Sequence, residues 1–443
     1  MEQISRSSRT VGAVAALAAV VLTACGDPQT DDGAIAFVNV NVVPMDANRV
    51  LTGQTVVVRD GRIAEMGPAS SVDVPSNAVE VDGSGKYLMP GIAEMHGHVF
   101  TTDVITPEVA ETFPELYVLT GVTTVRTMAG SPWQFELRDR IESGALIGPH
   151  IYTASPSLNG NSVNEVEHAH QLVREHHAAG YDLLKVHPGL SRAEYDAIVE
   201  TAAELGIRVA GHVSKDVGIR RALEARQGVD HLDGYYIEAG ADDATMAELA
   251  RVTKEAGVYN APTMDLWKTV LGVYQTEELS QRAELRYMLP ALVEQWVTQT
   301  AGIVQNAVAN RAEANRELAA RDRMLKALHA AGAKLLLGSD SPQIFSVPGF
   351  SLTHELPAMV DAGVPTYAAL EAATRNAAEY FGEEDEFGTV EVGKRADLIL
   401  VEGNPLDDIR NVHRQAGVMV RGHWIPKSEI EERLERIATL VAR

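Results

Sequence analysis

The sequence predicts an α/β protein, and two observations lead to this fold class. In the middle of the 443-residue chain, eight short apolar runs suited to β-strands are each followed by a helix-compatible stretch. This count and order are typical of a (β/α)8, or TIM, barrel, in which catalytic groups lie at the C-terminal ends of the strands. Strand-like runs with turn signals also flank this middle part on both sides. We therefore expect a barrel together with a small β-sandwich domain built from both termini.

The predicted domains divide the chain in order. The two parts of the β-sandwich are residues 34–87 and 383–426, the barrel is residues 88–382, and a C-terminal helix is residues 427–443. The first barrel strand is the run that ends at His98, and the other seven are expected at 122–125, 151–153, 183–186, 208–211, 229–232, 258–261 and 334–338. The region 266–328 is too long for one barrel helix, so we expect two or three helices there, near the mouth of the site.

Residues 1–24 are predicted to be a signal peptide rather than part of the fold. Two arginines precede a nearly all-apolar stretch at 11–22, which is too short for a permanent membrane span. The block Leu-Thr-Ala-Cys at 22–25 resembles the lipobox of bacterial lipoproteins. The resemblance implies that Cys25 is lipidated and anchors an extracytoplasmic protein, on the periplasmic side or at the cell surface. A plain secretory signal with an incidental cysteine is the alternative, and residues 25–33 are a polar tether.

The composition excludes some functions. Acidic residues outnumber basic ones by 61 to 38, which gives a formal net charge of −23. This charge repels nucleic acid and anionic membrane surfaces, so we expect no nucleic-acid partner and membrane attachment through the lipid anchor alone. Cys25 is the single cysteine, so an intrachain disulfide is excluded. A homo-oligomer is compatible with the sequence.

Two histidines on the first barrel strand are the starting point for a functional site. His96 and His98 are two positions apart, so their imidazoles point to the same side of a strand and can reach one ion. Such a pair by itself is weak evidence, because many histidines are surface or core residues. Other polar residues strengthen the case for a metal site.

Four further polar residues lie on or directly after predicted strands. Lys185 interrupts an apolar strand, where an unpaired ammonium group is costly, so it needs a partner. His212 and His231 lie at or near strand ends, and Asp340 follows the buried run 334–338. Taken singly, each is more often a capped strand end or a satisfied core group than a metal ligand.

Together these residues resemble the amidohydrolase superfamily of metal-dependent hydrolases. The set His96-x-His98, Lys185, His212, His231 and Asp340 falls on barrel strands one, four, five, six and eight, in the order of that superfamily. The segments 121–126, 373–378 and 388–398 are similar to the branch that contains imidazolonepropionases and Xaa-Pro or Xaa-Arg dipeptidases. The resemblance covers nearly the whole mature chain.

The resemblance implies a role for each of these residues. His96, His98 and Asp340 would hold the more buried metal ion, His212 and His231 the second, and a carboxylated Lys185 would bridge them. Two divalent ions would share a hydroxide and polarise the scissile carbonyl, with Asp340 as general base and acid. Zinc suits these ligands best, and manganese, iron and cobalt are the alternatives.

Three other residues are candidates for substrate contacts. Tyr235 could donate to a substrate carbonyl, as a tyrosine does in related dipeptidases, or be a rim tyrosine. Arg126 could bind a substrate carboxylate or pair with an acid under the barrel mouth. His354 follows the last strand and could line the pocket.

The leading functional hypothesis is a lipid-anchored, metal-dependent hydrolase of amide bonds in a small molecule, such as a dipeptide or an N-acyl amino acid. The same centre could instead open a lactone or an imidazolone-type ring, or cleave a phosphotriester. A binding lipoprotein without catalysis is a third reading, and the complete ligand set argues against it.

Overall fold

The computed structural model describes residues 33–99, 105–240 and 242–443. The chain divides into two units, Met1–Asp32 and Gly33–Arg443, and only the second contains described residues. The predicted signal peptide, the lipidation site Cys25 and nearly all of the tether lie outside the described ranges, so they stay predictions. Within these ranges, none of the helices is long and apolar enough to cross a membrane.

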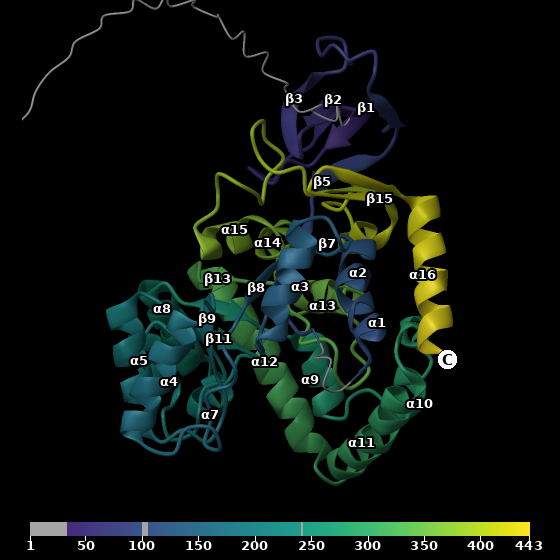
Figure 1. Cartoon of the computed structure of the whole chain (residues 1–443). Helices are drawn as coiled ribbons and strands as arrows, with labels where there is room; N and C mark the ends of the chain where they lie inside the picture. The colour runs from purple at the N-terminus through teal and green to yellow at the C-terminus, as the bar shows by residue number, and fades with distance from the viewer. Residues whose placement is uncertain (1–32, 100–104, 241) are drawn as a thin grey trace, which may run out of the picture. The chain divides into compact units, whose positions relative to one another are not determined.

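Both ends of the described chain contribute strands to one eight-stranded sheet (Figure 1). Its hydrogen-bonded order is β16-β15-β14-β5-β1-β2-β3, and β4 pairs with β1. The Asp60-Gly61 turn that joins β2 to β3 has positive φ at both residues, which suits Asp and Gly. The strands are β1 (Ile35–Val42), β2 (Leu51–Arg59), β3 (Arg62–Pro68), β4 (Val79–Asp82), β5 (Tyr87–Pro90), β14 (Leu398–Val401), β15 (Gln415–Val420) and β16 (His423–Pro426).

This sheet curves around its own apolar core. Phe37 on β1 meets Trp424 on β16 edge to face, with ring centroids 5.0 Å apart, although β5, β14 and β15 separate the two strands in the hydrogen-bonded order. The core also includes buried residues from both ends of the chain, among them Val56 and Leu398. Strands from both ends of the described chain therefore share one sheet and one apolar core.

Eight further strands run parallel to one another in sequence order. They form a three-stranded sheet, β6-β7-β8, and a five-stranded sheet in the order β9 to β13. The strands are β6 (Ile92–Gly97), β7 (Val122–Thr127), β8 (His150–Thr153), β9 (Leu183–Val186), β10 (Arg208–Gly211), β11 (Gly228–Asp230), β12 (Tyr259–Ala261) and β13 (Lys334–Leu335). All eight predicted strands are present, which confirms the α/β class.

Backbone hydrogen bonds connect these two sheets at both of their free edges. At one edge the Ser155 N–H donates to the Leu183 carbonyl at 2.8 Å. At the other, the Met95 N–H donates to the Leu337 carbonyl at 2.8 Å, and the Asp340 N–H donates to the His96 carbonyl at 2.7 Å. Strand β6, which carries His96, therefore lies beside the segment after β13 that carries Asp340.

Two strands end two or more residues earlier than predicted. The structure ends β11 at Asp230 and β13 at Leu335, whereas the apolar patterns extend to 232 and 338. At the first site the reason is backbone conformation, because His231 and Leu232 have φ of 63° and 54°, which no β-strand accommodates.

Helices follow most of the parallel strands, and their local sequence explains several boundaries. The helix after β9 begins with a capping box of Ser191 and Glu194 and ends at Gly206, a left-handed glycine. Between the parallel strands lie α1 (Pro107–Ala110), α2 (Thr112–Leu119), α3 (Trp133–Glu142), α4 (Val166–Ala178), α5 (Arg192–Leu205), α6 (Ile219–Glu224), α7 (Tyr235–Ala239) and α8 (Asp243–Ala256). After β13 lie α13 (Leu352–Asp361), α14 (Thr366–Ala372), α15 (Arg375–Phe381), the 3₁₀ helix η2 (Ile409–His413) and α16 (Lys427–Val441).

The long segment between β12 and β13 forms more helices than predicted. It contains α9 (Met264–Val270), α10 (Thr276–Leu279), the 3₁₀ helix η1 (Ala283–Tyr287), α11 (Pro290–Ala309) and α12 (Arg311–Ala331). Breaks at Gly272 and Pro290 divide it, since glycine and proline interrupt helices. We call this segment, residues 264–331, the insertion.

The C-terminal helix α16 lies beside α2 (Figure 1). The buried Glu115 of α2 forms ion pairs with two arginines of α16. Its Oε1 lies 3.1 Å from Arg433 Nη1, and its Oε2 pairs with Arg436. Helix α16 also buries one apolar stripe that includes Ile430 and Ile437. Its other face is exposed, as its many charged residues predict.

A buried carboxylate joins the insertion to the helix after the last strand. Glu355 on α13 accepts the backbone N–H groups of Met264 and Asp265, at 2.8 and 2.7 Å, at the start of α9. Burial raises the pKa of Glu355 to about 8, from an ordinary value of 4.5. The group therefore binds a proton more tightly in the folded chain than in the unfolded chain.

Replacing Glu355 with Gln should change how stability depends on pH. The proton-linked stability from Glu355 is complete below pH 4.5 and is lost as pH rises through about 8. The free energy of unfolding of Glu355→Gln should thus improve relative to wild type between pH 5 and 8, then level off. Urea unfolding across pH 5–9 measures this, with the exposed Glu294→Gln on α11 as control. A difference that stays constant with pH would contradict the prediction.

Candidate metal centre

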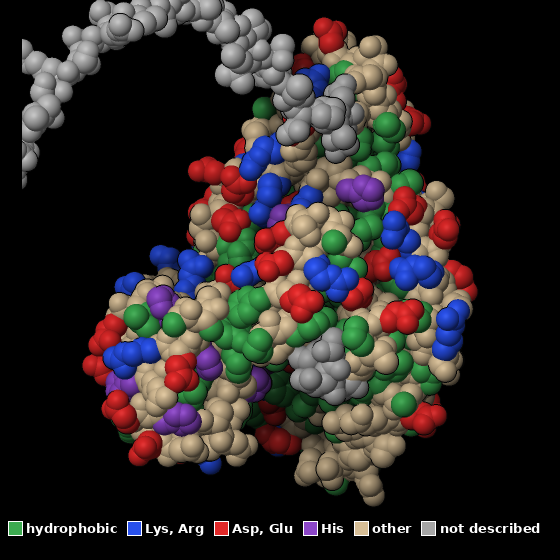
Figure 2. All heavy atoms as spheres, viewed as in Figure 1, with side chains coloured by type: hydrophobic (Ala, Val, Ile, Leu, Met, Phe, Trp, Pro, Cys, Tyr) green, Lys and Arg blue, Asp and Glu red, His purple; other side chains and the backbone are tan. Residues whose placement is uncertain are grey.

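A cavity of about 600 Å3 lies where the parallel strands end. Figure 2 shows a hollow in one face of the molecule, with histidine, acidic and hydrophobic side chains at its walls. The C-terminal ends of parallel strands meet at one edge, which brings residues far apart in sequence together. The lining residues are His96, His98, Val99, Ala129, His187, His212, His231, Asp233, Leu266, Trp267, Val270, Asp340, Pro342 and Gln343.

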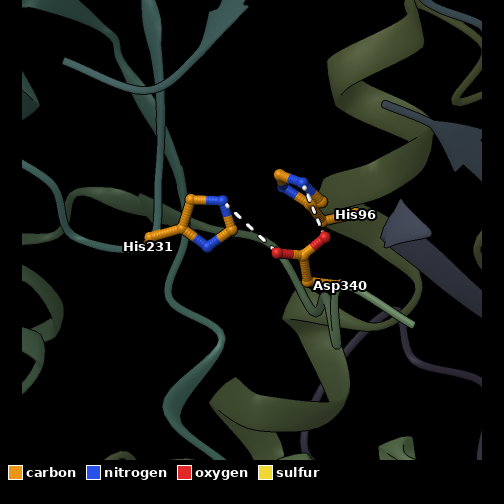
Figure 3. Close-up of side chains that lie close together, drawn as sticks. All are labelled: His96, His231 and Asp340. Atoms are coloured by element: carbon orange, nitrogen blue, oxygen red, sulfur yellow. Dashed lines mark ion pairs between the residues drawn. The ribbon is translucent and has the colours of Figure 1, made fainter. Parts of the chain in front are cut away.

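Three of these side chains make a compact cluster of potential ligand atoms. One atom each from His96, His231 and Asp340 lies within 4.8 Å of the other two, and all three residues are buried. The Asp340 carboxylate lies between the two imidazoles (Figure 3), with Oδ1 3.4 Å from His96 Nε2 and Oδ2 3.7 Å from His231 Nε2. Two imidazoles and a carboxylate are a common ligand set for zinc and related divalent ions.

Two more predicted ligands lie at the edge of this cluster. His98 Nε2 is 2.6 Å from Asp340 Oδ1. The His212 ring is 4.5 Å from the His231 ring, centroid to centroid, and its Nδ1 is 2.7 Å from Asp233 Oδ2. Because Nδ1 is engaged by Asp233, Nε2 is the nitrogen of His212 that is free to bind a metal.

Lys185 completes the predicted set from beneath the cavity. It is fully buried on β9, with Nζ 3.3 Å from His96 Nε2 and 3.7 Å from Asp230 Oδ2. Burial lowers the pKa of Lys185. The sequence argument that this lysine needs a partner therefore fits its position, and all six predicted ligand residues come together.

The protonation states of the cluster suit a metal site. Burial lowers the pKa of both His96 and His231 well below the ordinary value, so both are neutral, as metal-binding imidazoles are. Burial raises the pKa of Asp340, but His96 and the hydrogen bond from His98 outweigh this, so its pKa is lowered and it is ionised. His231 Nε2 is buried and has no hydrogen-bond partner among the described residues, as expected for an atom that binds an ion.

Comparison with known proteins agrees with this geometry. The pattern of the Amidohydrolase family matches residues 87–425. The chain belongs to the amidohydrolase family. It is therefore an enzyme, a hydrolase that acts on carbon–nitrogen bonds.

The relatives of this amidohydrolase have low sequence identity to it, but each match covers most of both chains. A 5-methylthioadenosine/S-adenosylhomocysteine deaminase from Moorella thermoacetica is 24% identical over 91% of this chain and 90% of its own length. An imidazolonepropionase from Symbiobacterium thermophilum is 24% identical over 80% of this chain and 84% of its own. The crystal structure of an Xaa-Pro dipeptidase with bound methionine has a TM-score of 0.68, with 21% identity, and the match covers 89% of this chain and all of that one. These matches confirm the predicted superfamily.

Two buried acids support the ligands of the amidohydrolase, and the sequence analysis did not assign either a role. Glu94 on β6 accepts the backbone N–H groups of His96 and Ser339, both at 2.9 Å, and burial raises its pKa to about 7. Asp230 places Oδ2 3.1 Å from His96 Nδ1. The signal for Glu94 was available, because Glu94, His96 and His98 share one face of a strand.

Gly338 lets the Asp340 segment approach the first strand. A Cβ at Gly338 would lie 2.8 Å from the Cβ of His96 and 3.0 Å from its backbone nitrogen. A larger residue would therefore push Asp340 away from the imidazole that it meets.

The structure places the three candidate substrate contacts away from the cavity lining. Tyr235 is buried, with its hydroxyl 2.8 Å from Thr253 Oγ1 and 3.0 Å from Asn260 Oδ1. The left-handed residues His231 and Leu232 turn the chain, so that Tyr235 begins α7 and packs against α8. A substrate contact from Tyr235 does not fit this position.

Arg126 and His354 also face other protein groups. Arg126 is buried, donates from Nε to the Met95 carbonyl at 2.6 Å and pairs through Nη2 with Asp230 at 3.0 Å. Of the two roles considered for Arg126, pairing with an acid is therefore the one that the structure shows. His354 Nε2 lies 2.7 Å from Glu284 of η1, and neither Arg126 nor His354 is among the residues that line the cavity.

His187 also lines the cavity. Its Nδ1 is hydrogen bonded to Ser157 Oγ, and its ring stacks on His212 with centroids 4.7 Å apart. Burial lowers the pKa of His187 to about 3, so it faces the cavity as a neutral imidazole.

Removing the hydrogen bond that orients His231 should weaken metal binding. Thr263 Oγ1 lies 2.8 Å from His231 Nδ1 and is fully buried. Thr263→Val keeps the shape but loses this bond, so we expect about a tenfold to hundredfold loss of metal affinity in chelator competition. Thr55→Val is the control, because the buried Thr55 Oγ1 has no hydrogen-bond partner among the described residues. Equal affinities in both variants would contradict the prediction.

Proposed function

We propose that this amidohydrolase cleaves an amide bond in a small molecule, the class to which dipeptides and N-acyl amino acids belong. The observation that supports this most directly is the convergence of six residues, His96, His98, Lys185, His212, His231 and Asp340, beside one cavity. Residues from five different strands meet there, which a purely structural role would not require.

The architecture that we propose is a complete (β/α)8 barrel, from β6 to β13, with a β-sandwich domain. The hydrogen bonds across both edges of the two parallel sheets support the barrel. The contact between Phe37 and Trp424 across the curved sheet supports the sandwich. The barrel and the sandwich are the detailed architecture that we propose for the α/β fold described above.

We further propose two divalent ions in this centre. His96, His98 and Asp340 would hold one, His212 and His231 the other, and a carboxylated Lys185 would bridge them, with zinc as the metal that the ligands suit best and manganese, iron and cobalt as alternatives. Bound divalent ions would lower the pKa of a water molecule and polarise the scissile carbonyl. Carboxylation would turn the buried Lys185 ammonium, which burial already disfavours, into an anionic group.

Asp340 is the residue that we assign to proton transfer. Its carboxylate is ionised and lines the cavity, so it can accept a proton from the attacking water and deliver it to the leaving nitrogen. His98 at 2.6 Å and the backbone bond from Asp340 N–H to the His96 carbonyl fix its position. A carboxylate held in this way has little freedom to leave the reacting atoms.

A second candidate function is hydrolysis of a ring carbon–nitrogen bond. The similarity to an imidazolonepropionase, whose name refers to an imidazolone ring, favours it. A panel of amides, imidazolone-type rings, lactones and phosphotriesters separates the candidates. A clear preference outside amides would displace the amide proposal.

Asp340→Asn tests the proposed mechanism. Asn keeps the size of the side chain but cannot accept the proton, so we expect kcat for the best amide substrate to fall about 10²- to 10⁴-fold, with KM changing less. Asp322→Asn on α12, outside the cavity lining, is the control, and circular dichroism checks that both variants fold. Unchanged turnover in Asp340→Asn would show that the mechanism is wrong.

Lys185→Ala tests the bridged pair of ions. We expect about two ions per wild-type chain by mass spectrometry, for protein grown with several divalent metals, and one or none in the variant. Lys268→Ala, which removes a lysine outside the cavity lining, should keep two. One ion in both wild type and Lys185→Ala would replace the pair with a single-metal site.

A further inference from the structure

One side of the cavity is an apolar wall. Leu266, Trp267 and Val270 of α9 line it, together with Val99 and Pro342 from segments that follow β6 and β13. Apolar and aromatic side chains in a ligand site contribute binding energy through burial and ring contacts. The wall lies beside the proposed metal ligands, so it would face one flank of a bound amide.

The indole of Trp267 is held firmly in this wall. Its Nε1 donates to the His231 carbonyl at 2.8 Å. The Arg321 guanidinium packs over the indole ring, 3.2 Å from the centroid, and donates to the same carbonyl at 2.6 Å. A rigid aromatic surface favours binding, because little side-chain entropy remains to be lost.

The positive charge of Arg321 is paired within the protein rather than directed at a bound ligand. The side chain is buried, and its Nη2 pairs with Glu317 at 2.7 Å. Arg126 is likewise paired with Asp230, and Lys185 lies beneath His96. The buried cations near the site are therefore occupied by protein groups.

The residues that line the cavity include two acids and no lysine or arginine within the part of the chain that the structure describes. The acids are Asp233 and Asp340. Residues 100–104, Phe-Thr-Thr-Asp-Val in the sequence, also contain no basic residue. Lys268 is next to Trp267 in sequence, but its positive charge interacts with the carboxyl group of Asp322 on α12. In Figure 2, the hollow is bordered by hydrophobic, histidine and acidic side chains.

A free carboxylate at this wall would lose its hydration and gain no lysine or arginine as a partner. Building on the amide-hydrolase function proposed above, we propose that the substrates are neutral amides with an apolar group of aromatic size on one side of the scissile bond. Zwitterionic dipeptides and N-acyl amino acids are disfavoured members of the amide class. Trp267 is the residue that sets this preference for an apolar group.

Two substrates that differ in one charge test this inference. N-phenylacetylglycinamide and N-phenylacetylglycine share the phenylacetyl amide, and release of phenylacetate is measured with the metal-loaded chain. We expect kcat/KM to be at least about tenfold higher for the neutral compound. A higher value for the carboxylate would overturn the inference and leave amide hydrolysis standing.

A lysine in the wall should change the preference. Val270 is 37% exposed, at the last position of α9, where a cation is tolerated. We expect Val270→Lys to reduce the preference for the neutral substrate at least about fivefold by attracting the carboxylate. Val297→Lys on α11, at a position that is 38% exposed and outside the lining, is the matched control. An equal effect in both variants would contradict the inference.

Binding separates the two proposals if neither amide is cleaved. The ketone isosteres of the two compounds, with CH2 in place of the scissile N–H, are compared by calorimetry. Tighter binding of the neutral ketone without turnover of either amide would support the ligand class and reject amide hydrolysis. Tighter binding of the carboxylate, or binding of neither, would overturn the ligand class.

Discussion

The buried carboxylate of Asp340 is the group on which the rest of the site depends. It lies between the imidazoles of His96 and His231 and against His98, and in a dry interior such a charge is stable only with close polar partners. Glu94 binds the backbone on both sides, at His96 and at Ser339. The ends of the first and last parallel strands are thus joined by side chains as well as by backbone hydrogen bonds.

The ligand set was predictable from sequence because it depends on strand geometry. Period-two alternation places His96 and His98 on one side, and parallel strands end at a common edge, so polar residues at strand ends converge. Lys185 was predicted from a different rule: burying an unpaired ammonium group is costly, so a lysine in an apolar strand needs a partner. These rules use only local pattern and apply wherever the strands form, which explains why all six residues lie together.

The predicted substrate contacts failed because their positions depend on loops. His231 and Leu232 both have positive φ, which is uncommon for two successive residues other than glycine, and the turn directs Tyr235 into the core instead of the cavity. His354 is hydrogen bonded to Glu284, which lies 70 positions earlier in the chain. Trp267 belongs to the insertion, whose place over the site depends on tertiary contacts that no local pattern encodes.

The apolar wall and the proposed second metal ion share one backbone group. Trp267 and Arg321 both donate to the carbonyl of His231, whose imidazole is a proposed ligand. A shift of α9 or α12 would therefore move this carbonyl and change the direction of the imidazole. In the proposed function, substrate selection and metal binding would therefore be coupled through His231, and a substitution that moves α9 or α12 would act on both.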